Sequence, residues 1–151
     1  MNKIIIGCDP DADKSGMAFY INNELCRLEC MTLIDIYIEF ESISKQWDDK
    51  EIELHIENVK GNSSAFTGMN ARQPLPVKMK MAQKVGMCKQ VQTEIERIAE
   101  HFGIKVIRHP ISKQWKKNKV MFEKLTGWTG RSNEDSRSGA YMGYLGLTQS
   151  K

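Results

Sequence analysis

The sequence predicts an α/β domain built on a five-stranded mixed sheet, and the order of its apolar segments carries this prediction. Three short strand-like runs lie near the amino terminus, at residues 3–8, 17–21 and 24–31. Two further strand-like runs, at residues 52–57 and 104–107, are separated by a long helical segment. A hairpin meander followed by alternating strands and helices gives a sheet with antiparallel and parallel neighbours, flanked by helices.

The composition fits one globular domain over residues 1–151. Hydrophobic residues make up 40% and charged residues 27% of the chain, which argues against disorder. No run approaches the roughly 18 apolar residues of a membrane span. The amino-terminal apolar stretch is too short for a signal peptide, and Asp9 interrupts it. We therefore expect a cytoplasmic protein with no membrane partner. Its compact single-domain build would suit bacteria or phage-infected cells. Its four cysteines lack zinc-site spacing and are expected to be reduced thiols.

The elements of the first half follow from local signals. Residues 3–8 are rich in β-branched side chains, as buried strands are. Asn22-Asn23 is a typical hairpin turn between the second and third strands. Thr32 is placed to cap a helix over residues 33–40, whose dense apolar residues predict a well-buried helix.

The second half alternates strands with helices. Residues 52–57 alternate apolar and polar side chains, which predicts a strand. Residues 58–73 are rich in Gly, Ser and Asn and predict a loop. A long helix is expected from about residue 75 or 77 to His101, ended by Gly103. Four of its residues form one apolar stripe, expected to be mostly core: Met87, Val91, Ile95 and Ile98. Two shorter helices are predicted at residues 119–126 and 133–147.

The net charge of +3 hides an uneven distribution. Residues 1–75 contain 7 Lys and Arg against 13 Asp and Glu, whereas residues 76–151 contain 15 against 6. This split suggests an acidic site and a basic surface in one domain. Two unrelated solvated faces explain it equally well.

Acidic residues occupy three element ends. Asp9 ends the first strand, Glu57 ends the fourth, and Glu134-Asp135 opens the last helix. Taken singly, each has an ordinary explanation: a turn, an exposed strand face, or a helix start. Taken together, clustered carboxylates can hold two metal ions about 4 Å apart for phosphodiester hydrolysis. Hard oxygen ligands favour Mg²⁺, with Mn²⁺ as the alternative.

These segments resemble the RuvC family of Holliday junction resolvases. The opening Ile4-Ile5-Ile6-Gly7-Cys8-Asp9-Pro10, followed by Ser15-Gly16, is similar to the family's first strand and the start of its second. Ile56-Glu57-Asn58 resembles the second acidic motif, and Gln83-Lys84-Val85-Gly86 lies in a helix like the one that follows it. Residues 133–140, NEDSRSGA, resemble the last-helix motif. The resemblance covers nearly the whole chain in element order.

The resemblance implies an RNase H-like fold and a metal-dependent endonuclease. Its implied substrate is branched DNA such as a four-way junction, cut during recombination and repair by a homodimer using Mg²⁺. Asp9, Glu57 and Asp135 would then be the catalytic metal ligands. The methionine-rich positions of the long helix would form a dimer seam.

The sequence departs from the family's pattern at Ser138, where a fourth acid is expected. Asp11 or Glu134 could replace the missing charge as a metal ligand. Alternatively, the site is weakened, or the protein binds nucleic acid without cutting it. These possibilities stay open at this point.

The region from residue 105 to residue 131 carries nine basic residues, counting His109. Such charge neutralises phosphates and gives salt-dependent affinity for nucleic acid. The candidate nucleic-acid-binding lysines are Lys113, Lys116, Lys117 and Lys119. Lys116 or Lys119 could also stabilise charge on the cleaved phosphate. Of the interleaved aromatic residues, Trp115 and Trp128 could stack on unpaired bases, whereas Phe122 fits better as core.

The loop before the long helix contains Phe66 and Arg72, two further candidates for nucleic-acid contact. The family resemblance implies a segment that inserts into a junction, and an ordinary surface loop is an equal alternative. Other readings of the whole chain also remain: an RNase H-like nuclease acting on precursor RNA, an exonuclease, or a non-catalytic nucleic-acid-binding domain. A sugar-kinase or actin-like protein is disfavoured, because 151 residues cannot supply its second lobe.

Overall fold

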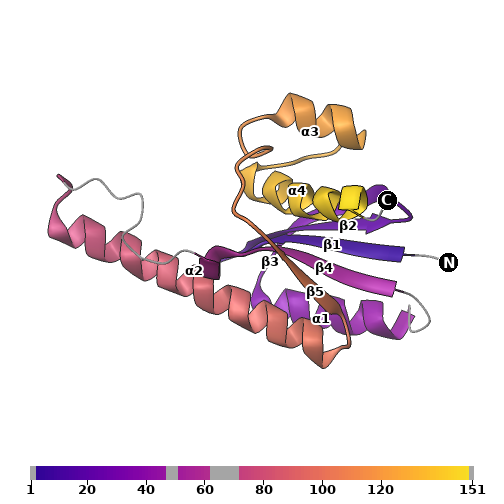
Figure 1. Cartoon of the computed structure of the whole chain (residues 1–151), viewed down its shortest axis with the longest axis horizontal. Helices are drawn as coiled ribbons and strands as arrows, with labels where there is room; N and C mark the ends of the chain where they lie inside the picture. Colours follow the sequence, from indigo (N-terminus) through magenta and orange to yellow (C-terminus); the bar gives the residue numbers. More distant parts are fainter. Residues whose placement is uncertain (1–2, 47–50, 62–71, 150–151) are drawn as a thin grey trace.

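The computed structural model describes residues 3–46, 51–61 and 72–149. It contains a five-stranded sheet in the order β3-β2-β1-β4-β5 (Figure 1). The strands are β1 (Lys3–Asp9), β2 (Ser15–Ile21), β3 (Glu24–Met31), β4 (Glu51–Glu57) and β5 (Lys105–His109). The helices are α1 (Leu33–Gln46), the short 3-10 helix η1 (Val59–Gly61), α2 (Leu75–His101), α3 (Lys119–Thr126) and α4 (Glu134–Gln149). The predicted α/β class and mixed sheet are confirmed.

The strand pairing brings the carboxyl ends of β1 and β4 side by side. β1, β2 and β3 pair antiparallel, whereas β1 pairs parallel with β4, and β4 with β5. The turn between β2 and β3 has positive φ at Asn22 (52°) and Asn23 (72°), as a tight hairpin turn requires. Cys8 lies opposite Ile56 in the β1–β4 register. Asp9 and Glu57, one residue further along each strand, therefore end at the same edge.

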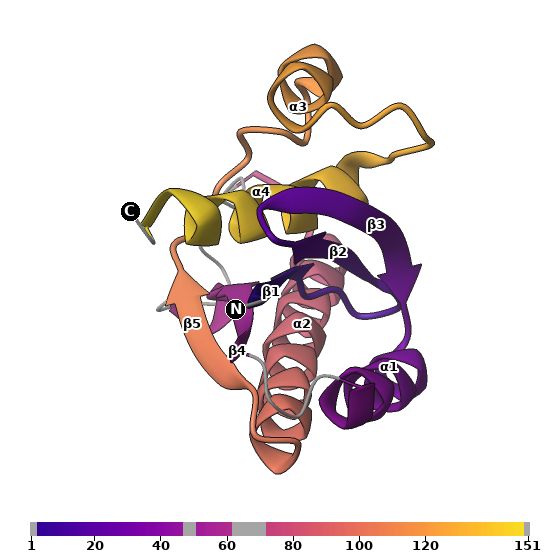
Figure 2. The same cartoon turned by 90° about the vertical axis from the view of Figure 1, so that its right-hand side faces the viewer.

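Helices cover both faces of the sheet (Figure 2). On one face, Ile4 and Ile6 of β1 share a core cluster with side chains of α1 and α2. On the other face, Ile5 belongs to the cluster formed with α3 and α4, and Gly7 lies directly under the α4 backbone. Since side chains alternate along a strand, Asp9 belongs to the α4 face.

Helix α1 is less buried than its sequence predicts. Ile36, Phe40 and Ile43 are buried against the sheet, but the side chains of Ile34 and Ile38 are 73% and 59% exposed. The prediction of a well-buried helix is therefore wrong, because α1 packs through one face and leaves the side chains of Ile34 and Ile38 largely exposed.

Helix α2 extends beyond the sheet (Figure 1). Its buried residues all lie within its last ten residues, at Gln92, Ile95, Glu96 and Ala99. In the predicted stripe, Ile95 is buried, Val91 and Ile98 are partly buried, and Met87 is 48% exposed. The apolar stripe begins beyond the edge of the sheet, so the sheet covers only its later residues. No helix in the described ranges, α2 included, is long and apolar enough to cross a membrane.

Helix α4 lies directly on the backbone of β1 and β2. A Cβ atom added at Gly7 would collide with the carbonyl oxygen of Gly139, and one added at Gly16 would collide with the carbonyl of Asp135. A Cβ at Gly143 would in turn meet the ring of Tyr20. This close approach fixes the start of α4 beside the end of β1.

We expect Gly7→Ala to destabilise the protein by about 3 kcal/mol, because overpacking a rigid backbone contact forces α4 away from β1. Gly86→Ala is the matched control, since a Cβ there meets nothing within 4 Å. That change should stabilise α2 by about 0.5–1 kcal/mol. Urea unfolding monitored by circular dichroism measures both, and equal effects at the two positions would contradict this account of the α4 packing.

Candidate active site

Two buried carboxylates and a third acidic side chain meet where β1, β4 and α4 come together. Asp9 is 4% exposed and Glu57 is 3% exposed. Their side chains are hydrogen-bonded to each other. Asp135, in the first turn of α4, lies close enough for the charge of Asp9 to raise its pKa. The structure thus brings together the three acids that the sequence singled out from separate segments.

The acidic pair cannot hold two negative charges without cost. Burial, followed by the hydrogen bond and charge of Asp9, raises the pKa of Glu57 to about 8. The backbone N–H of Ser112, which donates to Glu57 Oε1 at 3.1 Å, and the charge of Lys116 act in the opposite direction. Burial and the charge of Asp9 likewise raise the pKa of Asp135. Near neutral pH, the carboxyl of Glu57 therefore tends to hold a proton.

Lys116 supplies positive charge to this cluster. Its Nζ lies 3.3 Å from Asp9 Oδ2. Burial lowers the pKa of Lys116, but the negative charges of Asp9, Glu57 and Asp135 outweigh it and raise the pKa overall. The other three lysines predicted for this region are exposed at the surface: Lys113, Lys117 and Lys119. The Nζ of Lys117 pairs there with Glu134 Oε1 at 2.6 Å.

The two acids considered as replacements for the missing charge lie in different places. Asp11 is close enough to contribute to the raised pKa of Asp135, and its Oδ1 accepts hydrogen bonds from the Ala12 N–H at 2.8 Å and from Cys88 Sγ at 3.7 Å. Glu134 instead points to the surface, where the ion pair with Lys117 lowers its pKa.

Ser138 lies one helical turn after Asp135 on the same side of α4. The residue is 1% exposed, and its Oγ has no hydrogen-bond partner among the described residues. The position that would carry a fourth acid is therefore a buried, uncharged hydroxyl.

The donor atoms at this site fit a hard divalent cation. Asp9, Glu57 and Asp135 offer carboxylate oxygens, which Mg²⁺ and Mn²⁺ prefer. The ammonium of Lys116 beside Asp9 shows that the carboxylates already attract positive charge. Within residues 3–46, 51–61 and 72–149, no three His, Cys, Asp or Glu side chains are grouped closely enough to hold a metal ion. The donor atoms suit a hard divalent cation, but the three carboxylates would have to move closer together to bind one.

A buried polar network anchors the turn that follows Glu57. Gln92 Nε2 donates to Asn58 Oδ1 at 3.0 Å and to Glu96 Oε2 at 2.9 Å. Arg108 donates twice to Glu96, at 2.8 and 2.9 Å, and Lys60 Nζ lies 2.9 Å from the same carboxylate. Although burial raises it, these donors lower the pKa of Glu96 to about 2.

Sequence reasoning missed this network, although a signal was present. Gln92 and Glu96 are four residues apart on the buried side of α2, where an amphipathic helix should carry apolar side chains. Buried polar residues need partners, and these two find them on β5 and on the segment after β4.

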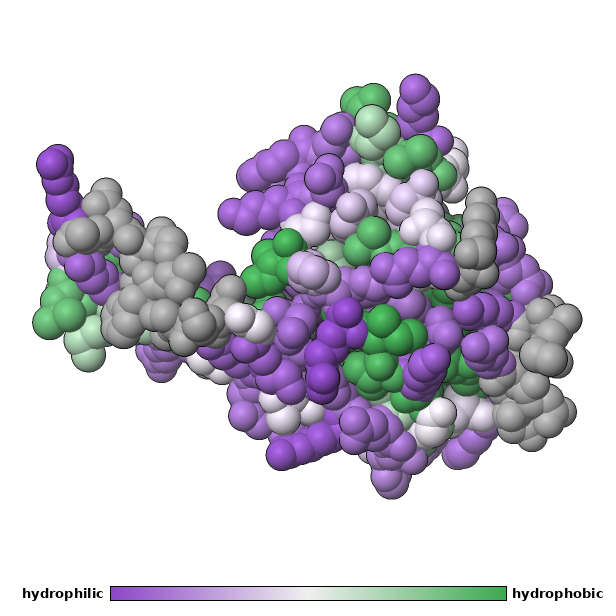
Figure 3. All heavy atoms as spheres, in the orientation of Figure 1, coloured by the Kyte–Doolittle hydropathy of each residue, from purple (hydrophilic) through white to green (hydrophobic). Residues whose placement is uncertain are grey.

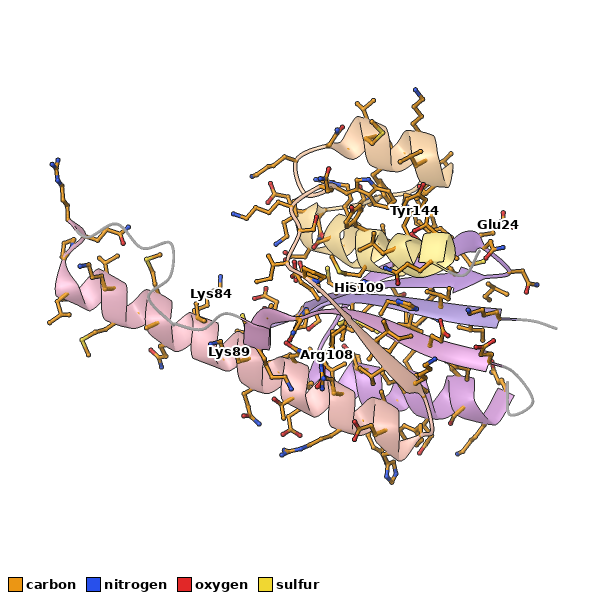
Figure 4. The ribbon with its side chains drawn as sticks, in the orientation of Figure 1. Glu24, Lys84, Lys89, Arg108, His109 and Tyr144 are labelled. Carbon is orange, nitrogen blue, oxygen red and sulfur yellow. The ribbon has the colours of Figure 1, made fainter. Side chains whose placement is uncertain are left out.

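A second buried polar row runs along the α4 face of β4. His55 Nδ1 lies 2.7 Å from His109 Nε2, and His55 Nε2 lies 3.0 Å from Glu53 Oε1. Figure 4 shows Arg108 turned toward α2 and His109 toward the opposite face of the sheet. Burial lowers the pKa of both histidines. The alternative of one exposed strand face for Glu53, His55 and Glu57 is therefore wrong, since all three are buried.

The remaining candidate residues for nucleic-acid contact are scattered. Arg72 is exposed three residues before the start of α2. Phe66 lies outside the described residues. Trp115 is only 2% exposed and packs within an aromatic cluster, so it cannot stack on bases in this conformation. Phe122 is fully buried, as predicted. Trp128 is partly buried and donates to the Arg131 carbonyl.

The fold is that of RuvC. A solved structure of T. thermophilus RuvC in complex with a Holliday junction substrate matches with a TM-score of 0.61 and 12% identity, covering 97% of this chain and 94% of that one. A structure of Thermus thermophilus RuvC by itself matches with a TM-score of 0.60 and 10% identity over the same shares. No family model and no curated protein matches the sequence. The predicted RNase H-like architecture is confirmed at the level of the fold.

The raised pKa of Glu57 predicts a loss of stability at alkaline pH. A carboxyl whose pKa rises from 4.5 to about 8 on folding contributes stability that is complete below about pH 4.5 and is lost as the pH rises through 8. In EDTA, between pH 7 and 8.5, the free energy of unfolding should fall by up to about 1.4 kcal/mol per pH unit. Glu57→Gln, which cannot ionise, should show a smaller decline.

Urea unfolding at several pH values tests this. The window lies above the range in which His55 and His109 titrate, because burial lowers the pKa of both. Glu94→Gln, at an exposed surface pair on α2, is the control and should behave as the wild type does. Parallel pH profiles for wild type and Glu57→Gln would show that the pKa of Glu57 is not raised on folding.

Proposed function

We propose that this chain is a divalent-metal-dependent endonuclease that cleaves phosphodiester bonds of branched DNA. The observation that carries the proposal is the buried pair of Asp9 and Glu57 at adjacent parallel strand ends, faced by Asp135 and by the ammonium of Lys116. A buried acid whose pKa is raised by a neighbouring acid occurs where a protein handles protons or cations. The likeness of the fold to T. thermophilus RuvC, which was solved with a Holliday junction substrate, supports the proposal.

In the proposed site, Asp9, Glu57 and Asp135 hold Mg²⁺ or Mn²⁺, and Asp11 adds negative charge from the side. Such cations activate water and stabilise charge on phosphate oxygens. The residues of the chain exclude bulk water, since the carboxyls of Asp9 and Glu57 are nearly fully buried. Glu57, whose pKa is raised, releases its proton when positive charge enters the site.

Lys116 has a separate role in this proposal. Its ammonium competes with other cations for Asp9 in the free protein. When a phosphodiester enters, the same ammonium can move to a phosphate oxygen and stabilise the charge that develops during cleavage. A lysine suits this role because its charge sits at the end of a flexible chain.

The surface around the site supplies affinity for the phosphate backbone. Lys113, Lys117 and Lys119 lie exposed in and next to the same irregular segment as Lys116, and such residues give binding that weakens steeply with salt. A four-way junction is the proposed substrate because the matching RuvC structure was solved on a Holliday junction. RNA cleavage and binding without cutting, the latter suggested by the uncharged Ser138, are the competing outcomes of the test.

We also propose that the protein acts as a homodimer through the projecting half of α2. Five apolar side chains are exposed there by between 38% and 65%: Leu75, Val77, Met79, Met81 and Met87. Figure 3 shows hydrophobic atoms at the tip of this helix, on a surface that is otherwise largely hydrophilic. Leu75 and Met79, four residues apart, lie on one side of the helix, whereas Val77 and Met81 lie on the opposite side. A second copy of α2 packed on the Leu75–Met79 side would cover those two side chains.

Asp9→Asn tests the nuclease function. The amide keeps the size of the side chain but removes the charge needed to hold a cation. With Mg²⁺ or Mn²⁺, the wild type should cut a labelled four-way DNA junction at paired sites, and Asp9→Asn should cut at least about 100-fold more slowly. Junction binding in EDTA, measured by fluorescence anisotropy, should be retained by the variant.

The substrates compared are a four-way junction, a matched linear duplex and a matched single-stranded RNA. Cutting of the RNA alone would mean that the substrate is RNA and not branched DNA. Binding to the junction without cutting under either metal would identify a non-catalytic binding domain, and equal cutting by Asp9→Asn would remove Asp9 from the mechanism.

Met79→Lys tests the dimer. Met79 is 60% exposed on the projecting half of α2, and a buried unpaired charge at a helix–helix seam should weaken dimerisation by at least about tenfold. Light scattering after size exclusion, over a range of concentrations, measures the molar mass. Ile38→Lys on α1 is the matched control, because Ile38 is 59% exposed on a different face. A monomeric wild type, or an unchanged mass for Met79→Lys, would contradict this interface.

A further inference from the structure

Arg137 is a buried cation that neither the acidic site nor the basic surface accounts for. It lies on α4, two residues after Asp135, and is 9% exposed. Its Nε donates to the Trp115 carbonyl at 3.0 Å and its Nη2 to the Lys116 carbonyl at 2.8 Å. Its Nη1 donates to Ser132 Oγ at 3.1 Å. Among the ion pairs of the described residues, none includes Arg137.

The carbonyls that Arg137 holds belong to a segment without regular secondary structure. Residues 110–118 join β5 to α3 and have no strand or helix ladder to satisfy their backbone groups. Buried backbone oxygens need a donor, and Arg137 supplies it to two successive residues. The ring of Trp115 is held at the same time by the rings of Phe122, Tyr141 and Tyr144, with centroids 5.1–5.5 Å away. The backbone at Trp115 and Lys116 is thereby fixed from both sides.

This anchoring decides where the Lys116 ammonium lies. The carbonyl of Lys116 is bound to Arg137, and its Nζ is 3.3 Å from Asp9 Oδ2. We propose that Arg137 is a positioning residue that holds the 115–116 backbone so that Lys116 reaches the acidic site. The inference rests on the proposed function for its catalytic consequence, but the placement of Lys116 itself does not depend on any activity.

The geometry requires arginine at this position. A guanidinium presents several N–H groups in one fixed plane, so it can bind two successive carbonyls and a hydroxyl together. A lysine keeps the charge but cannot reproduce that fork. Because Asp135 and Arg137 are both on α4, the same helix that carries the third acid also sets the position of the lysine opposite Asp9. Helix α4 therefore fixes both the carboxylate of Asp135 and, through Arg137, the position of the Lys116 ammonium.

The first test measures the accessibility of Lys116 in the full-length protein without substrate or metal. Acetic anhydride is used at low dose, and the acetylation of each lysine is quantified by mass spectrometry. In the wild type, Lys116 should react more slowly than the exposed Lys119. In Arg137→Lys, labelling of Lys116 should rise several-fold relative to Lys119. Arg97→Lys, at an exposed pair on α2, is the matched control and should leave the ratio unchanged.

The second test is a double-mutant cycle on junction cleavage. Lys116→Met should lower kcat by about 100-fold, and Arg137→Lys by about tenfold, because a displaced group loses its alignment with the reacting atoms. KM should stay close to the wild-type value in both. In the Lys116→Met background, Arg137→Lys should cause no further loss, since the residue through which it acts is absent.

Each outcome decides between positioning and general stability. A lower melting temperature with an unchanged Lys116 labelling ratio, or losses in kcat that multiply in the double variant, would overturn the inference. Absence of cleavage by every protein would remove the proposed function and leave labelling to decide the placement. If Arg137→Lys does not fold, Ser132→Ala removes one of the three acceptors and should raise Lys116 labelling to a smaller extent in the same direction.

Discussion

The site depends on one steric constraint: at Gly7 and Gly16, α4 rests directly on the backbone of β1 and β2 with no side chain between them. Gly7 and Gly16 leave the space that the carbonyls of Gly139 and Asp135 occupy. Any Cβ at these positions would lift the helix from the sheet. The contact places the first turn of α4 at the carboxyl end of β1, where Asp9 ends the strand. The third acid and the buried arginine both take their positions from it.

A second constraint is electrostatic and follows from the first. Packing α4 onto β1 removes water from Asp9 and Glu57, and this burial, with the hydrogen bond and charge of Asp9, raises the pKa of Glu57. The protein offsets this charge locally with the N–H of Ser112 and the ammonium of Lys116.

Behind the site, buried polar residues hold the irregular segments that carry its members. Glu96 and Gln92 bind the turn after Glu57, and Arg137 binds the backbone of Lys116. In both cases a rigid helix supplies the hydrogen-bond partner that an irregular segment lacks. This arrangement explains how residues from loops keep fixed positions: their backbone groups are satisfied by side chains from α2 and α4.

The sequence by itself determined the element order, the hairpin turn at Asn22-Asn23, the helix ends at Thr32 and Gly103, and the acids Asp9, Glu57 and Asp135 as one set. These follow from local spacing, capping and strand ends, which act over a few residues. Only the tertiary structure decided which polar side chains are buried: Glu53 and His55 lie under α4, Trp115 belongs to the core, and Lys116 alone of four neighbouring lysines reaches Asp9. The reason is physical. Burial and pairing depend on contacts between residues far apart in the chain, and a pattern of residue types does not encode which face another element will cover.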